Sequence, residues 1–506
     1  MKKLSAFALV LALLMTFTAC GARPAPDPYG DAMDIILSDD GVTVEGAEES
    51  AVYTANDIVY YEEGHDFTYG EGETGDAHSA AEAAEHTVVH IAKAGTYRLS
   101  GTLSRGQIAV DLGDEAEDDP NAVVTLILDG VDITCSVAPA IMFYHVYECG
   151  NTDNPTKDVD TSAAGANMIL AEGSTNTVHG AYVARIYKPE TVVLNEDGTE
   201  VEDAKKLHKY DGAVYSKMTM NVGGEGSLDI FAENEGLDTE LHLTINGGNI
   251  HIFSGNDGIN TNEDGVSVTT INGGSVNITV TGTTGEGDGI DSNGWLVING
   301  GAVTAQACAN SADAGIDSDM GIHINGGTVC ASGHMLDRIE EGGQTYAVFT
   351  FRDRQQGEIT LKDAAGEVVA TAAPENDYAI LIFSTPAMTE GTYSLWRGEK
   401  QLSVMQGGGM GGFGGMMRPE GELPEDFVPP EGFEMGEPPM DGERPQPPEG
   451  MEFPEGMTPP EGFGGVDGEK MPRPDGGRGD MGAQVLGESA VEFTLAAGGN
   501  MLTVDG

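Results

Sequence analysis

Residues Ile245–Gly248, which read Ile-Asn-Gly-Gly, decide the fold because the same four residues return three times at a nearly fixed spacing. The later copies begin at Ile271, Ile298 and Ile324, so the intervals are 26, 27 and 26 residues. Self-similarity at a period of this length indicates stacked structural units, none of which can bury its apolar face alone. The sequence therefore predicts a repeat architecture.

The residues around each copy point to strands rather than helices. Ser275–Val280 (SVNITV) alternates apolar and polar residues as a strand does, and the repeat shows no helical periodicity. A second signature accompanies each copy, at Gly236–Thr239, Gly258–Thr261, Gly289–Ser292 and Gly315–Ser318. A β-only unit of this length that stacks on copies of itself predicts an all-β fold, a right-handed parallel β-helix. Leucine-rich repeats have similar lengths, but their leucine spacing is missing.

The repeated residues have a structural interpretation of their own. Stacking would place the isoleucines in an interior aliphatic row, while the Gly-Gly pair makes a turn. The asparagines that follow them would stack as a hydrogen-bonded row. We therefore assign Asn246, Asn272, Asn299 and Asn325 to the architecture.

Composition divides the chain into parts on either side of the repeat. Residues 406–483 are rich in Gly, Pro, Met and Glu, which cannot bury a core, so we expect disorder there. Alternating apolar runs before and after that insertion predict a small antiparallel β cap that covers the open end of the stack. The expected organisation is a signal peptide at 1–19, a tether at 20–34, a parallel β-helix at 35–340 with an acidic insertion at 60–86, a cap at 341–405 plus 484–506, and the tail insertion 406–483.

The charge of the chain excludes one class of partner. The 506 residues contain 83 Asp and Glu against 24 Lys and Arg, which gives a formal net charge of −59. Nucleic-acid binding requires basic residues to neutralise phosphates, so we expect no nucleic-acid partner. An acidic polysaccharide would also be repelled unless a cation lies between the two.

The N-terminus resembles a bacterial export signal. Lys2 and Lys3 precede an apolar run, Leu4–Ala19, that is too short to span a membrane comfortably. The run ends at Cys20 in a context that resembles a lipoprotein processing site, in which the cysteine carries the lipid. We expect an extracytoplasmic lipoprotein that contacts the membrane only through this N-terminal lipid. An ordinary secretory signal is the alternative.

The repeat itself is acidic and contains no basic residue. Between Lys217 and Arg338 there is no Lys or Arg, whereas residues 218–337 contain 16 Asp and Glu. Stacked strands lie about 4.8 Å apart, so carboxylates at equivalent positions would form a column of like charge. Ca²⁺ accepts about 6 to 8 oxygen ligands and could link such a column. The candidate ligands are Asp257, Asn260, Glu286, Asp288, Asp291, Asp313, Asp317 and Asp319.

Turn chemistry offers a second explanation for the same aspartates, since Asp and Asn side chains stabilise turns by hydrogen bonds to their own backbone.

The cysteines also leave alternatives open. Cys135, Cys149, Cys308 and Cys330 lack the CxxC spacing of zinc sites, and they could form disulfides or remain buried thiols. Trp295 is the first choice for stacking on a sugar, with packing on the coil surface as the alternative.

Several segments together resemble a known family. These are Gly95–Leu103 (GTYRLSGTL), Leu128–Ile133 (LDGVDI), Asp211–Lys217 (DGAVYSK) and the Ile-Asn-Gly-Gly copies. They resemble secreted bacterial carbohydrate-binding proteins with a polysaccharide-lyase-like, right-handed parallel β-helix. The resemblance spans residues 35 to about 405 and the final strands. It implies bound calcium and the binding of cellulose- or pectin-like polysaccharides, without implying catalysis.

The residues themselves also disfavour catalysis. β-Elimination from a uronate needs a well-placed base, commonly Lys or Arg, and the repeat offers neither. Its nearest basic residues, Lys205, Lys206, Lys209, Lys217 and Arg338, lie only at its ends. The sequence therefore predicts non-catalytic, calcium-dependent polysaccharide binding at the cell surface. The alternatives are a surface adhesin or envelope scaffold that contacts protein, and a polysaccharide lyase-like enzyme.

Overall fold

The computed structural model describes residues 29–45, 51–65, 69–70, 72, 74–150, 152, 154–195, 197–199, 201–406 and 489–505. The predicted signal peptide, Cys20, most of the tether and all but the first residue of the tail insertion lie outside the described residues. All of the described residues fall in one compact unit. Strands dominate the described residues, whose helices are limited to α1 (Ala80–Ala83), η1 (Asp114–Asp118) and η2 (Pro189–Thr191). The all-β class is thus confirmed.

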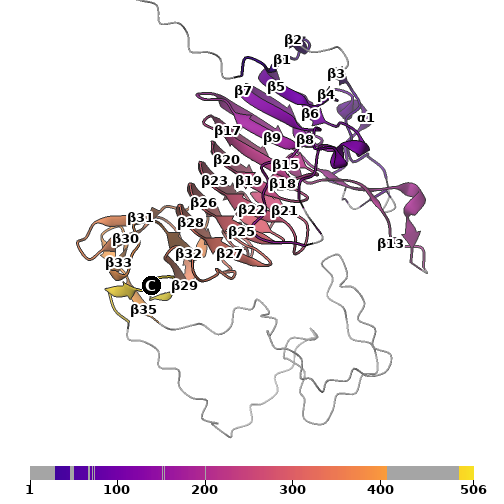
Figure 1. Ribbon diagram of the computed structural model, residues 1–506. Helices are drawn as coiled ribbons and strands as arrows, with labels where there is room; N and C mark the ends of the chain where they lie inside the picture. The colour runs from indigo at the N-terminus through magenta and orange to yellow at the C-terminus, as the bar shows by residue number, and fades with distance from the viewer. Residues whose placement is uncertain are drawn as a thin grey trace, which may run out of the picture. The chain divides into compact units, whose positions relative to one another are not determined.

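Three ladders of parallel strands occupy the repeat region, and the chain visits them in turn (Figure 1). The first ladder contains β16 (Met220–Gly224), β19 (Leu243–Ile245), β22 (Val268–Ile271), β25 (Trp295–Ile298) and β27 (Gly321–Ile324). The second contains β17 (Ser227–Ala232), β20 (Asn249–Ser254), β23 (Ser275–Val280), β26 (Ala302–Gln306) and β28 (Thr328–Gly333). The third, called the acidic ladder below, contains β15 (Gly212–Ser216), β18 (Glu235–Thr239), β21 (Ile259–Thr261) and β24 (Ile290–Ser292).

The register of the first ladder places the repeat residues opposite their own copies. Ile245 pairs with Ile271, which pairs with Ile298, and the next partner is Ile324. These isoleucines are at most 1% exposed, so the predicted interior row is confirmed. Burial of each side chain stabilises the stack by roughly 1.5–3 kcal/mol.

The predicted row of asparagines is also confirmed, and it lies on the surface. The side-chain amide of each asparagine donates to the side-chain oxygen of the asparagine one repeat earlier, at 2.9, 2.9 and 2.8 Å. The turn that follows depends on glycine, because Gly274 adopts a φ of +80°. A Cβ at Gly274 would also lie 2.5 Å from the carbonyl oxygen of Gly248, so stacked turns leave no room for a side chain.

The strands before the repeat extend the same sheets toward the N-terminus. The first two ladders continue into β9 (Ala166–Leu170), β10 (Thr175–Gly180), β7 (Val124–Cys135), β5 (Gly95–Leu103) and β1 (Met33–Leu37). The acidic ladder continues into β8 (Ile141–Phe143), β6 (Gly106–Val110), β4 (Thr87–Ile91) and β3 (Val52–Ala55). Antiparallel pairs of β3 with β4 and of β1 with β2 (Thr43–Glu45) make these sheets mixed.

Two features of this half were not predicted from the sequence. The acidic insertion contains α1, whose first turn is capped by the Ser79 hydroxyl, which accepts a hydrogen bond from the Glu82 backbone amide.

Residues 183–210 form an antiparallel arm (Figure 1). Its strands are β11 (Val183–Tyr187), β12 (Val193–Leu194), β13 (Val201–Asp203) and β14 (Lys206–Tyr210). Because β14 leads directly into β15, the arm brings its lysines to the acidic ladder.

At the other end, one strand beyond the repeat pairs antiparallel with its last strand, and the strands that follow pair with one another both antiparallel and parallel. β32 (Tyr378–Ser384) pairs with β28 and with β29 (Tyr346–Gln355), and β37 (Gly499–Asp505) pairs with β29 and β35 (Ser403–Gln406). A smaller sheet holds β30 (Ile359–Asp363), β31 (Val368–Ala372), β33 (Gly391–Arg397), β34 (Lys400–Gln401) and β36 (Phe493–Leu495). Phe349, Phe383 and Phe493 lie in a core cluster separate from that of the repeat.

Two observations bear on redox state and membrane contact. Cys135, Cys149, Cys308 and Cys330 are free thiols in the structure. Among the described residues, no helix has the length and apolar character needed to cross a membrane.

Candidate functional site

One row of the acidic ladder carries polar side chains instead of apolar ones. Tyr215, Asp238, Asn260 and Asp291 are consecutive partners across β15, β18, β21 and β24. The neighbouring positions, such as Ile259, supply the apolar core, so strand alternation turns this row to the other face. Asp238 is nevertheless 0% exposed and Asn260 only 7%. The row is therefore a line of oxygen-bearing side chains that is buried at Tyr215, Asp238 and Asn260 and half-buried at Asp291.

Three oxygens at this row have no hydrogen-bond donor from the described protein: Glu235 Oε2, Asp238 Oδ2 and Asn260 Oδ1. The companion oxygens do have donors. The Asn260 amide donates to Glu235 Oε1 at 3.0 Å, and the Asn262 amide donates to Asp238 Oδ1 at 2.5 Å. Buried polar groups are usually satisfied, so three acceptors left together call for a physical explanation. They favour a ligand that carries positive charge or donates protons.

Burial raises the pKa of Glu235 and Asp238 well above the usual range, and nearby carboxylates raise both further. Lys209 is the cation that faces them. Its Nζ lies 3.0 Å from the Asn262 side-chain oxygen and 3.7 Å from the carboxylate of Asp211. The interpretation that the lysines lie only at the ends of the repeat is therefore wrong for Lys209, because the arm folds β14 back onto the ladder.

A second group of carboxylates lies at the turns that lead into the ladder. Asp257 Oδ1 accepts the Asp288 backbone amide at 2.6 Å, and Asp313 Oδ2 accepts the Gly287 amide at 2.6 Å. Asp288 in turn accepts the amide of Ala314. Each carboxylate thus binds the backbone of a neighbouring coil rather than the backbone of its own turn, so these bonds are not the local turn chemistry considered as the alternative.

These turn carboxylates also repel one another. Burial raises the pKa of Asp288 to about 9, and the charges of Asp317 and Asp291 add to the rise. Burial likewise raises the pKa of Asp317 to about 7 and that of Asp291 to about 6, with Asp337 and Asp319 as the respective charged neighbours. A cation held here would remove the cost of keeping them ionised.

The structure brings together most of the predicted metal ligands but not all of them. Asp257, Asn260, Asp288, Asp291, Asp313 and Asp317 lie along the acidic ladder and its turns. Glu286 and Asp319 are exposed, but Asp319 still lies near enough to Asp291 to raise its pKa. Within the described ranges, no three His, Cys, Asp or Glu side chains already stand in an arrangement that would hold a metal ion.

The predicted ligand set left out Glu235, Asp238, Asp211 and Asp337, whose carboxylates the structure places near the predicted ones. The first two stand at the second signature of the first coil, so the signature itself was the signal that could have found them. Asp211 and Asp337 lie outside the repeated signature, and no pattern in the sequence marks them.

The aromatic residues divide between two places. Trp295, the predicted sugar-stacking residue, is half-buried on β25, where its partners are Val268 and Gly321. On the second ladder, the rings of His179, Phe231 and Phe253 stack in a row with centroids 4.5 and 5.2 Å apart. Sequence reasoning missed this row because its members stand at unequal spacings.

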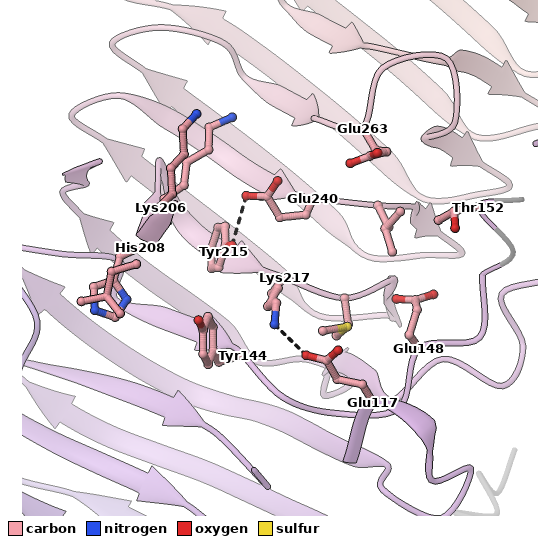
Figure 2. A pocket seen from close by; sticks show the side chains of 14 residues that line it. Glu117, Tyr144, Glu148, Thr152, Lys206, His208, Tyr215, Lys217, Glu240 and Glu263 are labelled. Atoms are coloured by element: carbon pink, nitrogen blue, oxygen red, sulfur yellow. Dashed lines mark hydrogen bonds and ion pairs between the residues drawn. The ribbon is translucent and has the colours of Figure 1, made fainter. Parts of the chain in front are cut away.

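A cavity of about 460 Å³ lies beside the start of the acidic ladder, and Figure 2 shows the side chains that line it. The Lys217 ammonium lies 2.6 Å from Glu117 Oε1 and 4.8 Å from the centre of the Tyr144 ring. Across the cavity, the Tyr215 hydroxyl donates to Glu240 Oε1 at 3.1 Å. This cavity, called the lysine pocket below, also includes Lys206 and Lys209 from β14.

The similarity to known proteins covers the same part of the chain. A model of the carbohydrate-binding domain-containing proteins matches residues 85–345, slightly more than half of the sequence. The chain belongs to this family. The match contains the acidic ladder and the lysine pocket, whereas the C-terminal strands from β29 onward lie beyond it.

A relative in this family and a solved structure are also similar. The relative is a carbohydrate-binding domain-containing protein of Acetivibrio thermocellus, 30% identical over 165 residues, which cover 32% of this chain and 44% of the relative. The match thus spans under half of that relative's length. The solved structure is a polysaccharide lyase-like protein from C. thermocellum, obtained as a gadolinium derivative. It is 22% identical, with a TM-score of 0.34 over 58% of this chain and 83% of that one.

Proposed function

We propose that this member of the family binds polysaccharide without cleaving it, and that it needs Ca²⁺ to do so. Family membership supports carbohydrate binding. The observation that carries the calcium requirement is the group of three buried oxygens without donors, on Glu235, Asp238 and Asn260. A hard divalent cation is the partner that such oxygens suit best.

The proposed architecture is a right-handed parallel β-helix with a β cap. Supporting it, consecutive strands visit the three ladders in turn, and each strand pairs in parallel with its counterpart one repeat later. Such a coil holds equivalent residues about 4.8 Å apart, a distance that lets one ion contact two neighbouring coils.

The donor set fits calcium. Glu235, Asp238 and Asn260 would hold one ion, and Asp257 and Asp288 with their turn neighbours would hold another. Carboxylate and amide oxygens are the ligands that calcium prefers, and none of these groups is a soft donor. A bound ion would supply positive charge at the acidic ladder and offset the repulsion between its carboxylates.

The same fit explains how so acidic a protein could hold a polysaccharide. A chain of net charge −59 repels a pectin-like polymer, and bound calcium reverses the local sign where the polymer approaches. A cellulose-like polymer would instead use its hydroxyls as ligands. The proposed ligands are therefore cellulose- or pectin-like polysaccharides.

The proposed location is the outer side of a bacterial membrane, with Cys20 as the lipid-bearing residue. The basic pair, the apolar run and the cysteine at its end support this proposal. Metabolic labelling with a palmitate analogue tests it, because label should enter the wild type and be lost in Cys20→Ser. Equal labelling of both would refute lipidation at Cys20.

A pull-down on insoluble polysaccharide tests the binding function. Protein should pellet with cellulose or calcium pectate in millimolar Ca²⁺ and stay in solution in EDTA. The double variant Glu235→Gln plus Asp238→Asn should lose most of the binding. Asp229→Asn, which changes a carboxylate of the second ladder that pairs with His251 at 2.9 Å, is the matched control.

Two outcomes would replace this proposal with another. Failure to bind any polysaccharide in Ca²⁺ would favour the adhesin or scaffold alternative, in which the surface contacts protein. Accumulation of unsaturated uronate absorbance during incubation with pectate would favour a lyase. We expect no such absorbance.

A further inference from the structure

The lysine pocket brings together three of the few basic residues of this acidic chain. Only 24 of its residues are Lys or Arg, yet Lys206, Lys209 and Lys217 line one cavity. They come from two neighbouring segments, β14 and the end of β15, which the arm holds against the acidic ladder. Glu117, Glu148, Glu240 and Glu263 line the same cavity. Both signs of charge therefore meet there.

The charged groups of the pocket are held in place by the protein itself. Glu148 accepts hydrogen bonds from the Thr219 amide and hydroxyl, both at 2.6 Å, and from the Gly150 amide at 2.5 Å. Lys217 is fixed by Glu117, and Glu240 by Tyr215. Groups fixed before a ligand arrives lose little entropy when they bind it.

This arrangement suits a neutral sugar ring. A sugar hydroxyl both donates and accepts, so neighbouring hydroxyls match a side-by-side donor and acceptor such as Lys217 and Glu117. The Lys217 ammonium also lies over the Tyr144 ring, 4.8 Å from its centre, and this contact helps to hold the donor in place. The cavity volume of about 460 Å³ falls within the range of small-molecule sites.

An anionic ligand suits the pocket less well. Lys217 and Lys209 already contact carboxylates, those of Glu117 and Asp211. The four glutamates outnumber the three lysines, so a second anion would meet net repulsion. The lining favours hydroxyl groups over carboxylates.

We propose that the lysine pocket is a second carbohydrate subsite, which binds a neutral sugar ring of a polysaccharide without calcium. This proposal rests on the proposed function, because the ligand is again a carbohydrate. The pocket differs from the calcium-dependent site in its position and in needing no cation. The acidic ladder binds through an ion, whereas the pocket binds through its own donors and acceptors.

Calorimetric titration in EDTA tests the pocket, with cellohexaose, xylohexaose, mannohexaose and galactotetraose as neutral probes and trigalacturonate as the anionic probe. We expect at least one neutral probe to bind in EDTA and trigalacturonate not to. Lys217→Met should weaken that binding about 10- to 100-fold, the loss expected for a hydrogen bond to a charged group. Lys157→Met is the matched control, since Lys157 pairs with exposed Asp158 away from the cavity.

A second variant guards against misfolding of the first. Leu207 lines the pocket with 39% of its surface exposed, so Leu207→Trp should fold while filling the cavity. It should abolish binding of the neutral probe and leave calcium-dependent pelleting with polysaccharide intact.

The outcomes separate the two proposals. If no neutral probe binds while polysaccharide still pellets in Ca²⁺, the pocket proposal is wrong and the proposed function stands. Binding of a neutral probe that survives both Lys217→Met and Leu207→Trp would also refute the pocket. Neutral binding in EDTA that both variants remove, without any calcium-dependent pelleting, would support the pocket and refute the calcium requirement.

Discussion

The acidic ladder and the lysine pocket adjoin each other, yet they satisfy their carboxylates in different ways. In the pocket, Glu117 and Glu240 each contact a protein donor, Lys217 and Tyr215. In the ladder, the Asp238 carboxylate is fully buried and one of its oxygens has no donor. A buried charge without a partner is costly, and the ladder leaves a carboxylate oxygen for which the described part of the chain supplies no donor. In the pocket, Glu117 and Glu240 therefore need no donor from outside the protein.

The number of acidic residues in a region therefore says less about its ligand than whether the chain itself places basic groups beside them. Where lysines lie near in the fold, the site suits a neutral ligand. Where residues 218–337 exclude them, the site suits a cation. Lys209 stands between the two, because it lines the pocket and also contacts the ladder through Asn262.

The largest expected effect is that of calcium on stability. At a concentration about a thousandfold above its Kd, calcium should raise the free energy of unfolding by about 4 kcal/mol. Calorimetric melting should show the wild type rising sharply and Glu235→Gln plus Asp238→Asn gaining less than half as much. In EDTA the order should reverse, because the variant lacks the buried like charges. A variant less stable than the wild type in EDTA would contradict the comparison.

The next effect is the pH dependence of the calcium-free protein. Carboxyls whose pKa rises on folding bind protons more tightly when folded, so their stability contribution is lost as pH increases. From the ordinary value of 3.8, burial raises the pKa of Asp291 to about 6, of Asp317 to about 7 and of Asp288 to about 9. Stability in EDTA should therefore fall between about pH 4 and pH 9.

Urea unfolding at pH 5, 7 and 9 measures this slope. The double variant Asp288→Asn plus Asp291→Asn should show a shallower fall than the wild type, which separates these groups from general repulsion across the chain. Saturating Ca²⁺ should flatten or reverse the slope, since the ion binds the deprotonated form. A wild-type stability that rises with pH in EDTA would refute the interpretation.

A substitution in the lysine pocket should have a smaller effect on stability. In EDTA it should destabilise the protein, whereas the double variant of the acidic ladder should stabilise it. Lys217→Met leaves Glu117 without its ammonium partner and should destabilise the protein by about 1 kcal/mol, because both side chains are partly exposed. The calcium affinity of the ladder should stay unchanged. Chemical unfolding and calcium titration of the same variant check both statements. A tenfold change in calcium affinity would show that the two regions are not independent.

The smallest effect should arise from the surface row of asparagines, which belongs to neither site. Asn272→Ala removes two exposed hydrogen bonds, to Asn246 and from Asn299, and should cost about 1 kcal/mol or less. Binding of calcium and of sugar should remain as in the wild type. Loss of either would assign this row a role beyond architecture.

The sequence could predict whatever depends on strict periodicity. Because equivalent residues recur every 26 or 27 positions, the buried row that includes Ile271 and the surface row that includes Asn272 followed from spacing alone. The turn carboxylates Asp257 and Asp288 were found in the same way. Their neighbour Glu286 was included as well, yet it lies exposed in the loop between β23 and β24.

The lysine pocket could not be predicted, because no period links the segments that form it. Glu117 comes from a short helix, Tyr144 from the loop after β8, and Lys206 from an arm whose folding direction has no signature. The same is true of Lys209, whose contact with the ladder depends on how β14 pairs with β11. Such sites are set by tertiary contacts between irregular segments.

We propose above all that the acidic ladder binds a metal cation. The metal content of the purified protein tests this most directly. Wild type and Glu235→Gln plus Asp238→Asn would be dialysed against calcium-containing buffer, desalted and measured by elemental mass spectrometry. We expect at least one equivalent of calcium in the wild type and fewer in the variant. Absence of calcium from the wild type, or equal calcium in both, would contradict it.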